Sequence, residues 1–386
     1  MRRSIAGPAA AAAVAVGGLL VGTAPAQAAP AGASGVTAAG APVVVVTKLN
    51  NPRQLTWADK GRRQLLIAEA GHGGTDACFS GHEGKDCLGL TGSVSLADNP
   101  ALRHNSLPYR LVKNLPSAAS PDGSFATGSD GVTARGLDAV FIAETWGPPS
   151  VLPVKPAYQK LVGKLILASR NGPVPVANIA KVELTQNPAG GPVDTNPYGA
   201  LALPDGRVLV ADAAGNDVIA VKGGKTSVFA VLPKHGCGGH VTPACDREAT
   251  PTSLALGPDG NIYVGELAHL EPGAARVWKY SASGKMLSWR GGFSSITGIA
   301  FASQDVMYVS QLFGDSGGGL PGLLTKVMQH SNARTSMPVP FPAGVAADLD
   351  GNVFVSAWSI APASGVSLAP GAPPVVGQVW KVRFPA

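Results

Sequence analysis

The chain has 386 residues, of which 50 are glycine and 33 are proline, while only 14% are charged. Lysine and arginine outnumber aspartate and glutamate by 30 to 24, which gives a formal net charge of +6. The basic residues form no cluster interleaved with aromatic residues, so the sequence predicts no nucleic-acid partner. Glycine and proline fall between short apolar runs, which indicates many tight turns rather than a disordered chain.

The first 28 residues have the features of a secretory signal peptide. Arg2 and Arg3 precede the apolar run Ala9–Val21, which is too short for a membrane span, and residues 26–28 form an A-x-A cleavage signal. We expect cleavage after Ala28, a flexible tail over residues 29–41 and a secreted protein without a membrane span. An uncleaved anchor is the alternative, and the choice between general and twin-arginine export stays open.

The four cysteines form two local pairs, Cys78 with Cys87 and Cys237 with Cys245. An even number of cysteines in an exported chain favours disulfides. Four cysteines allow three pairings, and pairing between neighbours is the most economical. The alternative is a metal site made by the side chains of His235, Cys237, His240 and Cys245.

A repeating unit is most complete between residues 196 and 221. It contains, in order, an entry turn (Asn196–Gly199), an apolar run (Ala200–Leu203), a Pro-Asp-Gly turn (Pro204–Gly206), a second run (Arg207–Ala211) ending at Asp212, and a third run (Val218–Val221). Short runs rich in Val and Leu that are split by Asp-Gly turns predict antiparallel strands.

The second run of this unit recurs six times, at intervals of about 45–75 residues. The copies end at Glu69, Glu144, Asp212, Glu266, Gln311 and Trp358. Repeats of ~40–50 residues with four short strands each are typical of a β-propeller. The sequence therefore predicts an all-β, six-bladed propeller over residues 42–386. The longer intervals predict insertions after Glu69, after Glu144 and between Leu232 and Ala249.

The last blade lacks an outer strand in the sequence. Gly377–Arg383 fits a third strand, and Val43–Thr47 is a spare strand that precedes the first repeat. A propeller closes into a ring to hide its sheet edges, so we expect Val43–Thr47 to complete the last blade. An open sandwich or two smaller β domains are the alternatives.

Several motifs around this repeat resemble the ScyD/ScyE-type family of secreted propellers. They are Asn50–Arg53, Ala68–Gly71, Asn187–Gly191, Asp194–Gly199, Asp212–Asp217, Pro251–Ala255, Gly257–Gly260, Tyr263–Glu266 and Gly273–Val277. The resemblance covers roughly residues 43–386, and the second blade and the cysteine loops depart from it. It implies the propeller fold and secretion, but no particular activity. More loosely, the pattern is similar to NHL and SMP-30/gluconolactonase propellers.

The ends of the second strands supply the candidate site, because these ends share one rim of a propeller. The candidate ligand or metal residues are Glu69, Glu144, Asp194, Asn196, Asp212 and Glu266, with Tyr198, Thr250 and Gln311 on the same rim. Several acids and amides around a channel mouth suit Ca²⁺, which takes 6–8 oxygen ligands and could polarise a lactone carbonyl. The alternative is that each acid ends its strand by accepting N–H groups of a turn.

Other motifs give weaker signals. Gly314–Gly318 matches the G-x-S-x-G pattern of serine hydrolases, but the Gly-Leu-Pro-Gly that follows cannot begin a good helix. We interpret this stretch as a plain rim loop. Three loop histidines are further candidates: His72, His82 and His269. Trp146 and Trp358 either stack on a ligand or pack against neighbouring loops.

Two functions are compatible with these observations. The first is a non-catalytic secreted propeller that binds an unknown protein or small-molecule ligand with its loop-rich rim, because binding sites commonly lie on loops held by a rigid scaffold. The second is a metal-dependent hydrolase of lactonase type. The sequence leaves open whether the protein is an enzyme.

Overall fold

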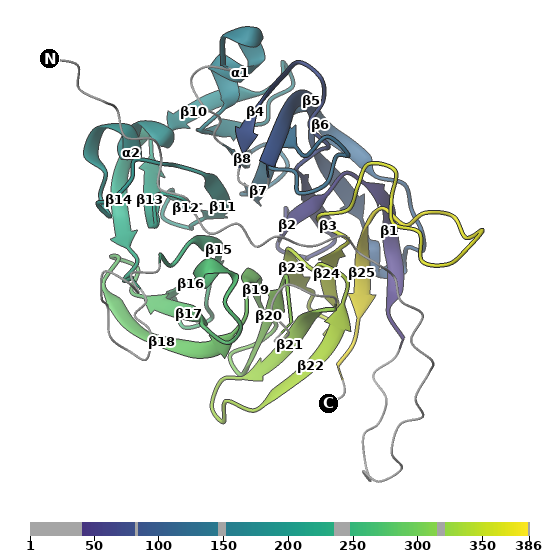
Figure 1. The fold of residues 1–386 in the computed structure, drawn as a ribbon. Coiled ribbons are helices and arrows are strands. Elements are labelled where there is room, and N and C mark those ends of the chain that lie inside the picture. Colours follow the sequence, from purple (N-terminus) through teal and green to yellow (C-terminus); the bar gives the residue numbers. More distant parts are fainter. Residues whose placement is uncertain (1–40, 82–83, 146–151, 235–247, 315–320, 385–386) are drawn as a thin grey trace, which may run out of the picture.

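The computed structural model describes residues 41–81, 84–145, 152–234, 248–314 and 321–384. Within these ranges the strands form six sheets arranged in a ring, as Figure 1 shows. The protein is therefore an all-β, six-bladed propeller, as predicted, and the open-sandwich and two-domain alternatives are wrong. The expected signal peptide and nearly all of the expected tail lie outside the described residues and stay predictions.

The first three blades follow the chain in order. Blade 1 has β2 (Pro52–Trp57), β3 (Gln64–Glu69), β5 (Gly84–Asp98) and β6 (Tyr109–Ala119), with β4 (Ala77–Gly81) paired to the first half of β5. Blade 2 has β7 (Ser129–Ala134), β8 (Val140–Glu144), β9 (Lys164–Leu167) and β10 (Val174–Asn178). Blade 3 has β11 (Pro197–Ala202), β12 (Val208–Asp212), β13 (Asp217–Lys222) and β14 (Lys225–Val231).

The other three blades complete the ring. Blade 4 has β15 (Pro251–Leu256), β16 (Ile262–Glu266), β17 (Ala275–Tyr280) and β18 (Met286–Phe293). Blade 5 has β19 (Ile296–Phe301), β20 (Val306–Gln311), β21 (Gly322–Met328) and β22 (Arg334–Val339). Blade 6 has β23 (Val345–Ala347), β24 (Val353–Ala357), β25 (Gly377–Val382) and β1 (Val43–Leu49). The described helices lie in the connections: α1 (Pro156–Leu161), α2 (Ala180–Gln186) and 3₁₀ turns at Pro100–Leu102, Leu152–Val154 and Ala268–Leu270.

The predicted second strands and the predicted ring closure are confirmed. All six second strands are present as β3, β8, β12, β16, β20 and β24. β1 pairs antiparallel with β25, so the spare N-terminal strand becomes the outer strand of the last blade. Figure 1 shows this closure as the purple strand β1 beside the yellow strand β25.

The hydrophobic core is divided among the six interfaces between neighbouring blades. One cluster of buried residues lies at each interface, because both faces of each sheet are apolar and pack against the next blade. The cluster between blades 6 and 1 contains Val45, Val46 and Leu49 of β1 together with Phe354. These three β1 side chains are at most 1% exposed. Closure of the ring is therefore a packing interaction as well as a strand pairing.

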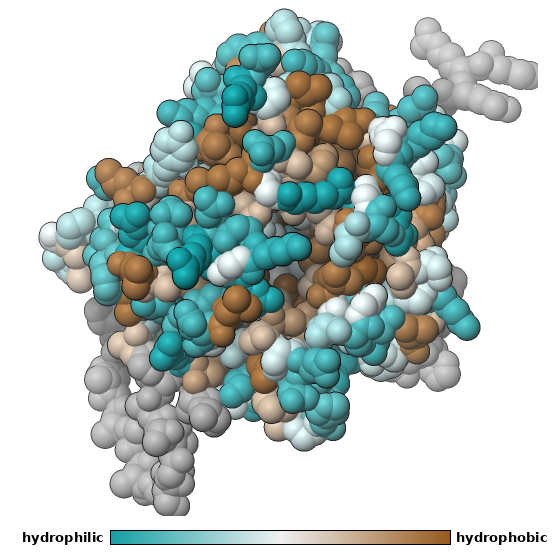
Figure 2. Space-filling model, turned by 180° about the vertical axis from the view of Figure 1, so that it is seen from behind, coloured by the Kyte–Doolittle hydropathy of each residue, from teal (hydrophilic) through white to brown (hydrophobic). Residues whose placement is uncertain are grey.

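Glycine is required where first strands approach each other at the centre of the ring. A Cβ on Gly199 would lie 2.5 Å from the Thr252 carbonyl oxygen of the next blade, and one on Gly131 would lie 2.4 Å from the Tyr198 carbonyl oxygen. Gly344 is as tightly packed against the backbone of β2. The first strands thus form a narrow inner wall. Seen from behind, the molecule is hollowed near the middle of the ring, as Figure 2 shows.

The predicted insertions follow the second strand of blades 1 and 2 and the fourth strand of blade 3. The first insertion contains β4 and the start of β5, and the second contains α1. The third lies mainly in residues 235–247, outside the described ranges. Within the described part of the chain, no helix has the length and apolar character needed to cross a bilayer.

Candidate functional site

The two faces of the propeller differ in the length of their connections. We call the face where the second strands end the upper face, and the opposite face the lower face. All six turns from first to second strands, on the lower face, have four to six residues. Four upper-face connections are much longer: residues 145–163, 179–196, 232–250 and 358–376. Extra chain has therefore accumulated on the upper face.

The candidate acids at the strand ends are buried and hydrogen-bonded within their own blades. Glu69, Glu144 and Glu266 are fully buried, and Asp212 is 1% exposed. Glu69 accepts from the Asn50 backbone N–H at 2.7 Å and from Arg110 at 2.9 Å. Glu266 accepts from the Arg276 backbone N–H at 2.8 Å and from the indole of Trp278 at 2.6 Å.

These contacts tie the end of a second strand to neighbouring segments of the same blade. In blade 3, Asp212 accepts from the Thr195 hydroxyl, from the Asn196 backbone N–H at 2.6 Å and from the Gly215 N–H at 3.1 Å. In blade 2, Glu144 accepts from the Ser129 hydroxyl at 2.9 Å, and burial raises its pKa well above the ordinary value. The carboxylates thus accept hydrogen bonds from nearby backbone and side-chain groups of their own blades. A role for them as ligands of a metal or a small molecule stays a prediction.

The structure brings together only part of the predicted candidate set. Asp194, Asn196 and Asp212 lie at one strand end of blade 3, where burial, with a further contribution from the Asp194 charge, raises the pKa of Asp212. Glu69, Glu144 and Glu266 stand at the ends of β3, β8 and β16, in three other blades. Within the described ranges, no group of three His, Cys, Asp or Glu side chains is arranged to hold a metal ion.

Two further acids join the blade 3 candidates, and sequence reasoning missed them. Asp217 is directly opposite Asp212 in the β12–β13 pairing, and Glu183 comes from α2 in the preceding connection. Burial, with the charges of Asp212 and Glu183, raises the pKa of Asp217 to about 8. Burial, with Asp212, Asp194 and Glu248, raises the pKa of Glu183 to about 7. The sequence signal for Asp217 was its position, because Asp212 and Asp217 flank the short turn at residues 213–216.

A β-bulge near the start of the first strand recurs in five blades. In each case the register shifts after the first paired residue, at Arg53 and Gln54 in blade 1 and at Asp130, Tyr198, Thr252 and Thr297 in blades 2 to 5. A bulge leaves a residue unpaired and redirects its side chain. The redirected hydroxyls bond across blades, since Thr252 donates to the Ile296 carbonyl at 2.5 Å and Thr297 to the Pro342 carbonyl at 3.0 Å.

Two of the bulge residues form a buried ion pair. Arg53 Nε lies 3.2 Å from Asp130 Oδ1. Arg53 also donates to the carbonyl oxygens of Ser359 and Ala126, which belong to upper-face connections. Burial raises the pKa of Asp130 to about 6, and this effect exceeds the opposing influence of Arg53. Burial also raises the pKa of the nearby Tyr198 to about 12. The ion pair therefore joins the inner wall to the loops above it.

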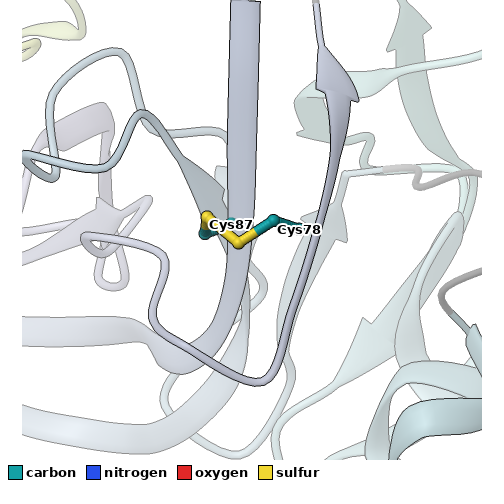
Figure 3. The surroundings of a disulfide bond; sticks show 2 residues. All are labelled: Cys78 and Cys87. Carbon is teal, nitrogen blue, oxygen red and sulfur yellow. A yellow bond between two sulfur atoms is a disulfide. The ribbon is translucent and has the colours of Figure 1, made fainter.

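The first two insertions contact each other on the upper face and form what we call the rim platform: β4, residues 84–92 of β5, and α1. Figure 3 shows the Cys78–Cys87 disulfide between β4 and β5, which confirms that predicted pair. Asp76, just before β4, accepts from Lys155 at 2.7 Å and from the Tyr158 hydroxyl at 2.6 Å. The bonds from Lys155 and Tyr158 lower the pKa of Asp76.

Apolar packing reinforces the rim platform. Tyr158 of α1 is fully buried, in a cluster with Leu88, Ala118 and Val162. The disulfide, the Asp76 contacts and this cluster fix the hairpin and the helix as one unit, although a connection of this length would otherwise carry high conformational entropy.

The other histidine and tryptophan candidates differ in burial and contacts. His72 is half-buried beside Asn51, and burial lowers its pKa. His269 is exposed in a 3₁₀ turn, as expected for a loop histidine. Trp358 is 5% exposed and packs against Phe341, with ring centroids 6.3 Å apart. The other candidates lie outside the described residues: Cys237, Cys245, His235, His240, His82, Trp146 and Ser316.

Comparison with known proteins identifies no family for this chain. No family model matches the chain, and no curated protein matches it. Among solved structures, the chain is similar to virginiamycin B lyase from Staphylococcus aureus, with 14% identity, a TM-score of 0.41, and coverage of 80% of this chain and 78% of that one. It is similar to the PQQ-bound aldose sugar dehydrogenase of Streptomyces coelicolor, with 11% identity, a TM-score of 0.48, and coverage of 88% and 96%.

A putative gluconolactonase is similar with 13% identity and a TM-score of 0.37, over 64% of this chain and 84% of that one. Identities this low carry no information about activity.

Proposed function

We propose that the protein is a secreted propeller of the ScyD/ScyE type that binds a protein or small-molecule ligand with its upper face and performs no chemistry on it. The observation that carries this proposal is the accumulation of long connections on the upper face, opposite a lower face whose first-to-second-strand turns have four to six residues. Loops held by a rigid scaffold are the usual place for binding. The Cys78–Cys87 disulfide supports an oxidising, extracellular location.

The rim platform is the best-defined part of this surface. An ordered segment binds with a smaller entropic penalty than a flexible loop, because fewer side chains are immobilised on binding. Asp76, held by Lys155 and Tyr158, and the disulfide both restrict the platform in this way. We therefore expect the ligand to contact the hairpin of β4 and β5.

The binding proposal is tested by comparing matched disruptions of the two faces. Molecules retained from spent culture medium by the immobilised wild-type protein are identified by mass spectrometry. The purified molecule is then titrated against two variants. Asp76→Ala with Tyr158→Ala loosens the rim platform, while Asp205→Ala with Arg207→Ala removes the lower-face ion pair. The upper-face variant should lose binding and the lower-face variant should keep it. Equal affinity for both variants would contradict the proposal.

A second candidate function, the metal-dependent lactonase, is favoured by one observation. Asp212 and Asp217 are directly opposite each other at the upper end of blade 3, and burial, with the charges of neighbouring acids, raises the pKa of each and of Glu183. Oxygen ligands of this kind suit Ca²⁺, and a bound cation could polarise a lactone carbonyl. The assay is hydrolysis of a simple aliphatic lactone with added Ca²⁺ or with EDTA, by wild type, Asp212→Ala and the exposed control Asp138→Ala. Turnover that EDTA and Asp212→Ala both abolish, while Asp138→Ala keeps it, would overturn the binding-only proposal.

A further inference from the structure

A cavity of about 350 Å³ opens among the lower ends of the first strands. Its walls come from β2, β11, β15, β19 and β23, and from the turns that follow β2, β15 and β19. The apolar lining side chains include Trp57, Leu201, Leu254, Ile299 and Phe301. This volume is at the lower end of the range for small-molecule sites, which are typically concave and mostly apolar.

At the inner end of the cavity, the Gln54 and Thr252 side chains already make hydrogen bonds, whereas the buried Ser253 hydroxyl, which also lines the cavity, has no hydrogen-bond partner among the residues that the structure describes. The Gln54 side chain bridges three blades, since its Nε2 donates to the Ala200 carbonyl at 2.7 Å and its Oε1 accepts from Ala200 and Val132. The Thr252 hydroxyl donates a hydrogen bond to the Ile296 carbonyl oxygen. Beyond this level the first strands pack closely at Gly199. An occupant would therefore enter from the lower face and meet mainly apolar surface, the hydrogen-bonded Gln54 and Thr252 side chains and the Ser253 hydroxyl.

Arg62 is the charged side chain that lines this cavity. It is half-buried, and its Nη1 donates to the Ala347 carbonyl at 2.9 Å, an oxygen that also accepts from Trp57 Nε1 at 2.8 Å. Within the described ranges, the other guanidinium N–H groups of Arg62 have no protein acceptor. Burial lowers the pKa of Arg62, and the Asp348 charge opposes this.

Asp348 does not compete for the free N–H groups of Arg62. Its carboxylate accepts from the backbone N–H groups of Asp350 and Asn352 and from the Asn352 side chain, at 2.6–2.9 Å. A guanidinium with N–H groups directed at no protein acceptor is suited to a carboxylate, which it can bind through two parallel hydrogen bonds.

We propose that this lower cavity binds a small amphipathic carboxylate, with its apolar part between the Leu201, Leu254 and Phe301 side chains and its carboxylate on Arg62. The site is on the face opposite to the rim platform, so it is independent of the function proposed for the upper face. The acid group fixes the orientation of the ligand, and the apolar walls supply most of the favourable transfer free energy.

The test uses the mature chain and three probes of equal chain length: decanoate, decanol and decyltrimethylammonium. Isothermal titration calorimetry at pH 7.5 gives affinity and stoichiometry. Decanoate should bind with one molecule per chain and more tightly than the other two probes. Arg62→Gln should weaken decanoate binding by at least about tenfold, because glutamine has no charge and cannot make the charge-assisted hydrogen bonds of the guanidinium. The same substitution should leave decanol binding nearly unchanged.

Two further variants make the outcome specific. Arg63→Gln removes the neighbouring exposed arginine, which does not line the cavity, and should leave decanoate affinity unchanged. Leu201→Trp places a larger side chain in the cavity and should abolish binding of decanoate and decanol alike, with the far-ultraviolet circular dichroism unaltered. Equal effects of Arg62→Gln and Arg63→Gln, equal affinity for the three probes, or no saturable decanoate binding to the wild-type protein would each overturn the proposal.

Discussion

Arg53 and Asp130 form an ion pair at the centre of the ring, with side chains that are 5% and 0% exposed. The two residues occupy equivalent bulges in neighbouring blades, and Arg53 also donates to carbonyl oxygens of Ser359 and Ala126. Removing one partner of a buried pair leaves the other charge without compensation in a medium of low polarity. The pair should therefore matter far more to stability than ion pairs on the surface.

We predict that Asp130→Ala lowers the free energy of unfolding by about 3–5 kcal/mol. The matched control is Asp205→Ala, which breaks the exposed Arg207–Asp205 pair of 2.7 Å and should cost about 0–1 kcal/mol. Urea denaturation followed by tryptophan fluorescence measures both values. A loss of less than about 1 kcal/mol in Asp130→Ala would show that the buried Arg53 charge is satisfied by its carbonyl contacts alone.

The second prediction concerns ring closure. Deleting residues 29–41 should leave stability nearly unchanged, because that segment precedes the first strand. Deleting through Thr47 removes most of β1, including Val45 and Val46, and exposes the edge of β25. Each buried valine contributes roughly 1.5–3 kcal/mol, so the longer deletion should cause a large loss of stability or aggregation.

Thermal unfolding and size-exclusion chromatography distinguish the two deletions. A monomer of near wild-type melting temperature from the longer deletion would refute a structural role for β1, since the interface between blades 6 and 1 would then be stable without it.

The third prediction is a pH dependence that comes from Asp217. Its pKa of about 8 in the folded protein is above the ordinary value near 4, so the folded state holds the proton more tightly than the unfolded chain. The contribution of Asp217 is fully present below about pH 4 and is lost as the pH rises to about 8. Asp217→Asn removes this loss. The variant should exceed wild type in stability by about 1–3 kcal/mol at pH 8.5, with the difference shrinking toward pH 4.

Denaturant unfolding at pH 4.5, 6.5 and 8.5 measures the effect. Asp138→Asn, which changes an exposed aspartate, serves as the control and should show the same difference from wild type at all three values. A pH-independent effect of Asp217→Asn would mean that Asp217 is ionised throughout this range. Glu183, with a pKa of about 7, should shift stability in the same direction over a narrower range.

Sequence reasoning predicted the ring because its signals are local. A short apolar run that ends in an acid, such as the run that ends at Asp212, is enough to identify a second strand. The intervals between successive runs of this kind give the number of blades. The Arg53–Asp130 pair has no such signal, because its partners meet only after two blades have packed. Glu183 was also missed, because α2 is one short helix in a long connection and its position depends on tertiary contacts.

The candidate site was predicted only in outline for a related reason. The sequence places Glu69, Glu144 and Glu266 at one rim, and the fold keeps them at separate strand ends. Each accepts hydrogen bonds within its own blade, a use of the carboxylate that the pattern of strand and turn cannot distinguish from ligand binding. The lower cavity depends on side chains from five first strands and on no contiguous motif.

The last prediction concerns the Cys78–Cys87 disulfide. Closing a loop with this sequence separation of 9 contributes roughly 2–3 kcal/mol in the chain-entropy model, but only to the segment that the loop constrains. The hairpin is an addition to blade 1, and Asp76, Lys155 and Tyr158 hold it independently. The double variant Cys78→Ser, Cys87→Ser should therefore keep its far-ultraviolet circular dichroism while becoming more sensitive to proteases between residues 76 and 92.

Adding Tyr158→Phe to this variant removes a second restraint and should increase proteolysis further, because the phenol donates to Asp76 at 2.6 Å. Intact-mass spectrometry of the protein purified under non-reducing conditions supplies the companion measurement. Two disulfides, including the predicted Cys237–Cys245 pair, lower the mass by four hydrogens, whereas free thiols at Cys237 and Cys245 with bound zinc would support the metal alternative. Global unfolding of the double variant at room temperature would contradict a role confined to the rim platform, because it would make the disulfide a requirement of the ring itself.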